Sequence, residues 1–188
     1  SRLLPARVAG RMVQPGDLQH VHVLGQLVQD PARNKSMADL IAAYVVKDRK
    51  VMVVSERLKH LSALHALLGP SMDRLGRVVS IGYYVGGKSE AELKEAERAN
   101  VILATKQMIE EGLDIPAVDV LVLSTPMSDV EQTVGRARRF CEPSESKCQH
   151  LCPWRAGRCE GKPTPIIVDV VDVDIVQAKK KRSRRVRF

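Results

Sequence analysis

Short apolar runs that alternate with amphipathic segments restrict the fold of this sequence more than any other feature. Three such runs occupy residues 51–54, 101–104 and 120–123, and residues 166–170 form a fourth that is apolar except for Asp169. A run that is apolar at every position suits a strand that crossover helices bury on both faces. Strands that alternate with helices indicate βαβ units and a mostly parallel sheet. We therefore expect an α/β fold, doubly wound, with helices flanking the sheet.

Apolar periodicity and capping residues predict the helices between these strands. In a capping box, a Ser side chain and an acidic side chain three residues later each bond to the other's backbone amide. Ser89 and Glu92 form this pattern, as do Ser128 and Glu131, and Ser36 with Asp39 is a variant of it. The predicted helices are residues 36–47, 57–68, 89–99 and 128–139, and residues 78–85 are predicted to be extended.

The N-terminal residues are expected to connect the fold to an upstream neighbour. Residues 20–28 begin with alternating His and Val, which predicts a half-buried edge strand. We assign residues 1–33 to this connecting segment and edge strand, 34–172 to one domain and 173–188 to a basic tail. The chain begins with Ser rather than Met, which suggests a fragment of a longer protein.

Charge and composition narrow the class of protein. The formal net charge is +8, but Lys and Arg side chains at residues 179–187 of the tail contribute seven of these charges, so the rest of the chain carries only +1. A tail of this kind can neutralise phosphates, act as a nuclear address or keep a protein soluble. No apolar run approaches the roughly 20 residues needed to cross a membrane. We expect an intracellular protein of the nucleus or the cytoplasm, with no membrane partner.

The most informative motif is the predicted helix that ends at Arg139. Gln132, Arg136 and Arg139 fall at helical offsets of zero, four and seven, so their side chains share one face. Gly135 lies in the middle of this helix, where Gly costs about 1 kcal/mol relative to Ala. The pattern fits an ordinary solvent-exposed arginine face, or a helix that presents two guanidinium groups to a ligand.

A second motif follows the strand at residues 101–104. This strand runs into a polar loop that contains Thr105, Gly112 and Asp114. Ligands of doubly wound sheets bind beyond the carboxyl ends of the strands. Taken singly, Asp114 could equally be a turn residue and Thr105 a strand-end cap. The same edge is expected to hold Ser55, Gly86 and Gly87, of which Ser55 could also be a helix N-cap.

The motifs together resemble the second RecA-like lobe of superfamily 2 helicases, in the correct order over residues 34–172. This resemblance implies a RecA-like sheet, and it is nearest to the XPB-like and UvsW-like DNA helicases. The residues that carry it are 51–55 for motif IV, Gly86 and Gly87 for motif IVa, Thr105 with residues 112–116 for motif V, and the helix from Gln132 to Arg139 for motif VI.

The resemblance also implies roles for single residues. Arg136 and Arg139, with Gln132, would be the catalytic group, because arginine fingers stabilise charge on the transferring γ-phosphoryl group and raise the rate about 10³–10⁵-fold. Gly112 and Asp114 would lie against the nucleotide. The residues that would contact the nucleic-acid backbone are Ser55, Gly86, Gly87 and Thr105.

ATP hydrolysis in this class also needs a Gly-rich P-loop and an acidic motif that binds Mg²⁺, and the sequence contains neither. We therefore expect ATP and Mg²⁺ to be shared with an N-terminal RecA-like lobe that carries the P-loop. The expected function is the second motor lobe of an ATP-dependent helicase or translocase, inactive as an ATPase by itself. The subfamily resemblance favours duplex DNA as its nucleic acid.

A cysteine-rich insert interrupts the pattern at residues 141–159. Its spacing is Cys-x6-Cys-x3-Cys-x6-Cys, and few apolar residues surround it. Four thiolates in one short segment favour a structural Zn²⁺ site, with His150 as a substitute ligand. Free or disulfide-linked cysteines are the alternative. The expected ligands are Cys141, Cys148, Cys152 and Cys159.

A function of another class also fits the sequence. The chain would then be a non-catalytic, zinc-bearing module that binds nucleic acid or acts as a scaffold on a RecA-like fold, because the P-loop is missing. The alignment of Arg136 with Arg139 on a helix weakened by Gly135 favours the motor function, since a retired lobe has no physical need for it.

Overall fold

The central element of the structure is a five-stranded, fully parallel sheet with the strand order β4-β5-β3-β6-β7. The computed structural model describes residues 6–8, 11–13, 22, 24–47, 49–73, 79–111, 115, 118–127, 134 and 164–172. The predicted α/β class with a parallel sheet is confirmed. The strands of the sheet are β3 (Val51–Ser55), β4 (Ile81–Tyr84), β5 (Val101–Thr105), β6 (Val120–Leu123) and β7 (Ile166–Asp169).

Burial explains why these runs form the strands. Every residue of β3 and of β6 is buried, whereas each residue of the outer strands β4 and β7 is only partly buried. Successive side chains alternate between two cores: Val51 and Val53 enter one, and Met52 and Val54 enter the other. The continuous apolar runs therefore reflect a sheet that is covered on both faces.

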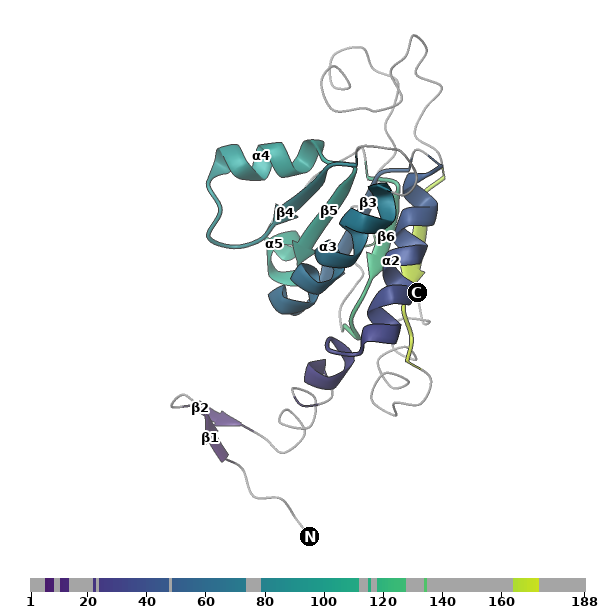
Figure 1. Ribbon diagram of the computed structural model, residues 1–188. Coiled ribbons are helices and arrows are strands. Elements are labelled where there is room, and N and C mark those ends of the chain that lie inside the picture. The colour runs from purple at the N-terminus through teal and green to yellow at the C-terminus, as the bar shows by residue number, and fades with distance from the viewer. Residues whose placement is uncertain are drawn as a thin grey trace.

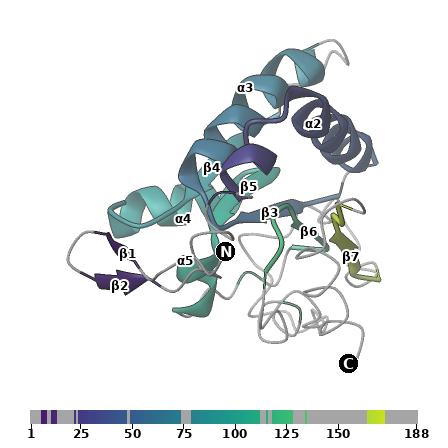
Figure 2. The same ribbon diagram turned by 90° about the horizontal axis from the view of Figure 1, so that it is seen from below.

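Helices cover the two faces unequally. Helices α2 (Pro31–Val45) and α3 (Leu58–Asp73) pack side by side over one face (Figure 1). The short helix α5 (Lys106–Glu110) lies on the opposite side of the sheet (Figure 2), and its Ile109 joins the second core. The longer α4 (Glu90–Arg98) packs against the outer strand β4. Because all five strands are parallel, their carboxyl ends lie at a single edge of the sheet.

The start of α2 differs from the prediction. The helix begins at Pro31, not at residue 36, and Asp30 is its N-cap, because its carboxylate accepts from the amides of Ala32 and Arg33 at 2.9 and 3.1 Å. Ser36 lies inside the helix and donates to the carbonyl of Ala32, so the capping box expected at Ser36 is wrong. The Asp-Pro pair is the stronger start signal, since Pro is favoured at the first helical position.

The edge strand expected at residues 20–28 is also wrong. Residues 22 and 24–27 are helical. Leu24, Leu27 and Val28 are buried, and their spacing of three and four residues is that of a helix face. The alternation that predicted a strand was too short to outweigh this spacing. Strands β1 (Ala6–Val8) and β2 (Arg11–Val13) form a separate antiparallel pair that the sequence did not predict.

Helix α4 follows the prediction closely. Both halves of the capping box are present, because the Ser89 hydroxyl accepts from the amide of Glu92 and the Glu92 carboxylate accepts from the amide of Ser89. Ala96 is its buried residue, and it faces Gly82 on β4. A Cβ at Gly82 would lie 2.5 Å from the Ala96 Cα, so this close packing requires Gly.

Candidate functional site at the carboxyl edge of the sheet

The carboxyl ends of all five parallel strands meet at one edge, which is the usual ligand-binding edge of a doubly wound sheet. Ser55 ends β3 and Thr105 ends β5, while Gly86 and Gly87 follow β4. Four predicted nucleic-acid contacts therefore reach the same edge. They differ in whether their polar atoms can meet a ligand.

An open groove of about 470 Å³ lies where β3, β4 and β5 end. Gly86, which follows β4, and Thr105, the last residue of β5, both line it. Gly86 and Gly87 are exposed, and Gly87 has a φ of 82°, a conformation that side chains rarely adopt. The turn therefore brings backbone, without a covering side chain, to the rim of the groove.

Thr105 is suited to a ligand contact. It occupies the N-cap position of α5, but its side chain makes no capping hydrogen bond. The residue is half-buried and lines the groove. Its hydroxyl can therefore donate to an acceptor that enters the groove. The strand-end cap considered from the sequence does not describe it.

Side-chain charge alone does not make this groove a phosphate site. Among the described residues that line it, the carboxylates of Glu56 and Glu110 outnumber the single cation, Lys106. The Lys106 Nζ also lies 3.3 Å from Glu110 Oε1, so much of its charge is already matched. A phosphate would depend on the Gly86 backbone amide and the Thr105 hydroxyl. Such contacts position a nucleic-acid strand without reading its sequence.

Ser55 does not fit the direct contact that was predicted for it. The residue is fully buried. Its Oγ accepts from the backbone amide of Arg57 at 3.1 Å and lies 3.1 Å from Nδ1 of His60. Because both functions of the hydroxyl are used inside the fold, it has no group left for a ligand. The helix N-cap that was its alternative is displaced in the structure, because α3 begins at Leu58, three residues after Ser55.

His60 is the centre of a buried hydrogen-bond network beneath the edge. Asn34 Nδ2 donates to the carbonyl of Val28 at 3.0 Å, which leaves Asn34 Oδ1 as the acceptor for His60 Nε2 at 3.1 Å. His60 Nε2 therefore carries the proton, and Nδ1 accepts from the Ser55 hydroxyl. Burial and, to a smaller extent, the nearby Arg33 charge lower the pKa of His60 to about 4, against the opposing effect of the Asp172 carboxylate. The neutral ring links α2, α3 and β3.

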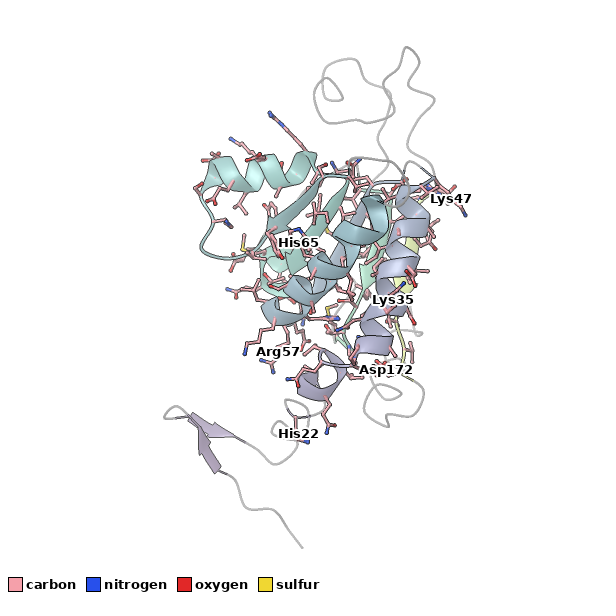
Figure 3. All side chains as sticks on the ribbon, in the orientation of Figure 1. His22, Lys35, Lys47, Arg57, His65 and Asp172 are labelled. Atoms are coloured by element: carbon pink, nitrogen blue, oxygen red, sulfur yellow. The ribbon has the colours of Figure 1, made fainter. Side chains whose placement is uncertain are left out.

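A second set of contacts joins α2 to the ends of β6 and β7. The Arg33 guanidinium binds Asp172 through both carboxylate oxygens, at 2.7 and 3.1 Å. Its Nη2 also donates to the backbone carbonyl of Ser124 at 2.8 Å. Both side chains are mostly buried, and Figure 3 shows Asp172 beside the start of α2. We refer to Arg33, Asp172 and the Ser124 carbonyl as the Arg33 clamp.

The ends of β3 and β6 are also bonded to each other. The Ser124 hydroxyl donates to the carbonyl of Val54 at 2.7 Å. The Thr125 hydroxyl accepts from the backbone amide of Glu56 at 3.1 Å. Because Glu56 lines the groove, this bond connects the groove directly to the segment that follows β6. Ser124 and Thr125 are both fully buried.

Sequence reasoning missed Arg33, Asn34, His60 and Asp172. Asn34 is a weak helix former inside a helix, which usually indicates that its side chain has a partner elsewhere. His60 lies on the buried stripe of α3 with Leu61 and Leu64, where a polar side chain needs a hydrogen bond. The sequence contains no comparable signal for Arg33 or Asp172, which are 139 residues apart.

Several predicted site residues lie outside the described residues. Val134 is the described part of the predicted arginine helix; it is helical and packs against the second core. In the described ranges, no group of three or more His, Cys, Asp or Glu side chains could hold a metal ion, and no helix is long and apolar enough to cross a membrane. The residues outside are Gly112, Asp114, Gln132, Arg136, Arg139, Cys141, Cys148, Cys152 and Cys159.

Comparison with known sequences gives one clear relative. The chain is 32% identical over 153 residues to a protein of Acanthamoeba polyphaga mimivirus named "Putative ATP-dependent RNA helicase". The match covers 81% of this chain and 25% of the mimivirus protein, so the chain spans about a quarter of that relative's length. No family model matches the chain.

Solved helicase structures share its fold. The chain aligns with the C-terminal part of the Fun30 ATPase domain with a TM-score of 0.55 at 12% identity, over 79% of this chain and 43% of that one. It aligns with T4 UvsW with a TM-score of 0.57 at 18% identity, over 88% and 34% of the two chains. The chain is thus similar in sequence to a named helicase and similar in fold to helicase and ATPase domains.

The Hef helicase domain of Pyrococcus furiosus is a third structural neighbour of the chain. The TM-score is 0.51 at 18% identity, over 81% of this chain and 28% of that one. At these identities the structural likeness shows the RecA-like fold alone. The predicted resemblance to superfamily 2 helicases is thus confirmed by both sequence and fold, whereas the roles of single residues remain predictions.

Proposed function

We propose that this domain is the second motor lobe of an ATP-dependent nucleic-acid helicase or translocase. In this proposal, a separate lobe with a P-loop holds ATP and Mg²⁺, and this lobe closes on it. Arg136 and Arg139, assisted by Gln132, then stabilise the transferring γ-phosphoryl group. Gly112 and Asp114 lie against the nucleotide. Hydrolysis reopens the two lobes and shifts the contact with the nucleic acid.

The observation that carries the proposal is the groove shared by Gly86 and Thr105. The exposed glycine turn lies after one strand, and the threonine hydroxyl, which makes no capping hydrogen bond, lies at the end of another. Both line the groove at the edge where this fold binds ligands. The mimivirus relative is named as an ATP-dependent helicase, and the aligned part of Fun30 is the C-terminal part of an ATPase domain. The first name supports a helicase, and the second supports its C-terminal lobe.

In this proposal, the groove contacts the phosphates of a nucleic-acid strand mainly through protein backbone amides. Gly86 and Gly87 supply amides, and Thr105 supplies a hydroxyl. The subfamily resemblance favours duplex DNA, whereas the mimivirus relative is named for RNA. DNA and RNA present the same phosphate groups, so binding assays must compare them directly. Ser55 has no part in this contact, because its hydroxyl is used inside the fold.

Binding of nucleic acid by this chain is the first test. Replacing Thr105 by Val removes the hydroxyl and keeps the branched shape. We expect this change to weaken binding of a labelled duplex by about 1 kcal/mol, which is about fivefold in Kd. Fluorescence anisotropy at a fixed salt concentration measures it for DNA and RNA duplexes of the same sequence. Ser62→Ala is the matched control, because the Ser62 hydroxyl is exposed and donates within α3.

ATP hydrolysis in a protein that also contains the P-loop lobe is the second test. We expect Arg136→Ala and Arg139→Ala each to lower nucleic-acid-stimulated kcat by about 10³-fold or more. Wild-type kcat in both variants would overturn the motor function. If both variants kept wild-type ATPase while Thr105→Val still weakened binding, the non-catalytic binding module would be favoured.

A further inference from the structure

The Arg33 clamp is the most buried ionic contact at the carboxyl edge among the described residues. The Arg33 side chain is 8% exposed and that of Asp172 16%. Three hydrogen bonds join the guanidinium to oxygen atoms, two to the Asp172 carboxylate and one to the Ser124 carbonyl, and Nη1 also donates to Sδ of Met37 at 3.7 Å. Arg33 thereby ties the first turn of α2 to the residues that follow β6 and β7.

A buried ion pair is weak evidence for stability by itself. Removing charges from water costs several kcal/mol per ion, and apolar residues of similar volume often stabilise a core equally well. The fold contains a comparison at its opposite edge, where Arg49 Nη1 binds Asp119 Oδ2 at 2.7 Å. That pair joins the residues before β3 and β6, away from the groove. Comparing the two pairs separates the effect of a pair's position in the fold from the effect of losing a buried ion pair.

The Ser124 carbonyl oxygen, which accepts from Arg33, indicates the function of the clamp. Ser124 is the first residue after β6, and the following residues through Met127 are buried. Along the chain, Gln132 lies eight residues after Ser124 and Arg136 lies twelve residues after it. The segment from Ser124 to Met127 therefore sets where the chain leaves the sheet before it reaches the proposed arginine fingers.

The same segment is connected to the groove. Thr125 accepts from the amide of Glu56, a groove residue, and the Ser124 hydroxyl bonds to Val54. These bonds fix the segment against β3, and the clamp fixes it against α2 and β7. A displacement of about 1 Å at a catalytic group can cost about 100-fold in rate. The backbone position of Ser124 is therefore expected to affect the positions of Gln132 and Arg136 further along the chain.

We propose that Arg33 is a positioning residue for the proposed ATPase reaction, acting through Asp172 and the Ser124 carbonyl on the exit of the chain from β6. This inference rests on the proposed function. Arg33 does not touch nucleotide in this scheme. Its planar fork suits this arrangement, because Nε and Nη2 each reach one oxygen of Asp172 while Nη2 also reaches the Ser124 carbonyl. The single nitrogen of a lysine does not reproduce this fixed geometry.

The test compares Arg33→Gln with Arg49→Gln in the protein that contains both lobes. We expect Arg33→Gln to lower nucleic-acid-stimulated kcat by about 10- to 100-fold. The KM for ATP and the Kd for nucleic acid should stay within about twofold, because binding groups are unchanged. Arg49→Gln should lower the melting temperature to a similar extent and leave kcat within about twofold. A merely structural role would not separate the two variants.

Two further variants keep the result decisive. If Arg33→Gln does not fold, Arg33→Lys keeps the charge, and we expect it still to lower kcat without changing KM. Equal kcat values in Arg33→Lys, Arg49→Gln and wild type would overturn the positioning role. Failure of the proposed function is recognised separately, because Arg136→Ala would then also retain wild-type kcat. Loss in Arg136→Ala together with wild-type kcat in the Arg33 variants would reject this inference alone.

Discussion

Nε2 of His60 donates to Oδ1 of Asn34 at 3.1 Å, and this contact determines the tautomer of the buried neutral ring. Asn34 presents its oxygen because its amide nitrogen is bonded to the Val28 carbonyl. His60 Nδ1 must then accept from Ser55, so the neutral ring satisfies every partner. Protonation at Nδ1 would turn this acceptor into a donor and break the hydrogen bond from the Ser55 hydroxyl. The network therefore depends on pH.

The first prediction concerns this dependence. The pKa of His60 is lowered from 6.5 to about 4 in the folded chain, so the unfolded chain takes up a proton first as the pH falls. The contribution of the neutral His60 ring to the free energy of unfolding is fully present above about pH 6.5. It is lost progressively between pH 6.5 and 4, by about 3 kcal/mol in total. Urea unfolding of wild type and His60→Gln across this range measures the difference.

His65→Gln is the matched control for that experiment. His65 Nδ1 lies 2.8 Å from the Tyr83 hydroxyl on the outer part of the same face, outside the buried network. We expect the His65 variant to keep the wild-type slope of unfolding free energy against pH, and His60→Gln to flatten it. Parallel slopes for wild type and His60→Gln would show that the ring titrates normally.

Close packing of α4 on β4 predicts a steric effect at Gly82. Gly82→Ala places a Cβ 2.5 Å from the Ala96 Cα and 2.8 Å from its Cβ, so the helix must move. We expect a loss of about 1–3 kcal/mol of unfolding free energy. Gly25→Ala is the control, because nothing lies within 4 Å of a Cβ there. Thermal unfolding compares the two, and equal melting temperatures would contradict the observed packing.

The N-cap of α2 gives a third prediction. Asp30→Ala removes the carboxylate that accepts from the amides of Ala32 and Arg33. We expect a loss of about 1 kcal/mol in chemical unfolding. Ser36→Ala is the control, because Ser36 lies within the helix and donates only to the Ala32 carbonyl. A larger loss for Ser36→Ala than for Asp30→Ala would restore the capping box first expected at Ser36.

The fourth prediction concerns the cysteine insert. If Cys141, Cys148, Cys152 and Cys159 bind zinc, the purified chain should contain about one Zn²⁺ per molecule, because structural sites are usually four-coordinate. Elemental analysis after gel filtration measures this content. Cys148→Ser should lower it, whereas Ser144→Ala within the same insert should not. A metal-free chain with four titratable thiols would exclude the site.

The sequence alone determined the sheet and its edge. Continuous apolar runs such as residues 51–54 can be buried only when both faces of a strand are covered, which is a local property of composition. The capping box at Ser89 is equally local, because its two bonds span three residues. The resemblance to superfamily 2 helicases rests on short motifs of the same kind. These features needed no knowledge of distant contacts.

Only the tertiary structure decided which polar residues at the edge remain accessible. Ser55 and Thr105 are both hydroxyl residues that end strands, yet Ser55 is used by His60 and Thr105 faces the groove. Arg33 and Asp172 form their pair across 139 residues of sequence, and no local pattern encodes it. Burial and hydrogen-bond partners depend on which elements pack together, so a residue's type and spacing cannot reveal them in advance.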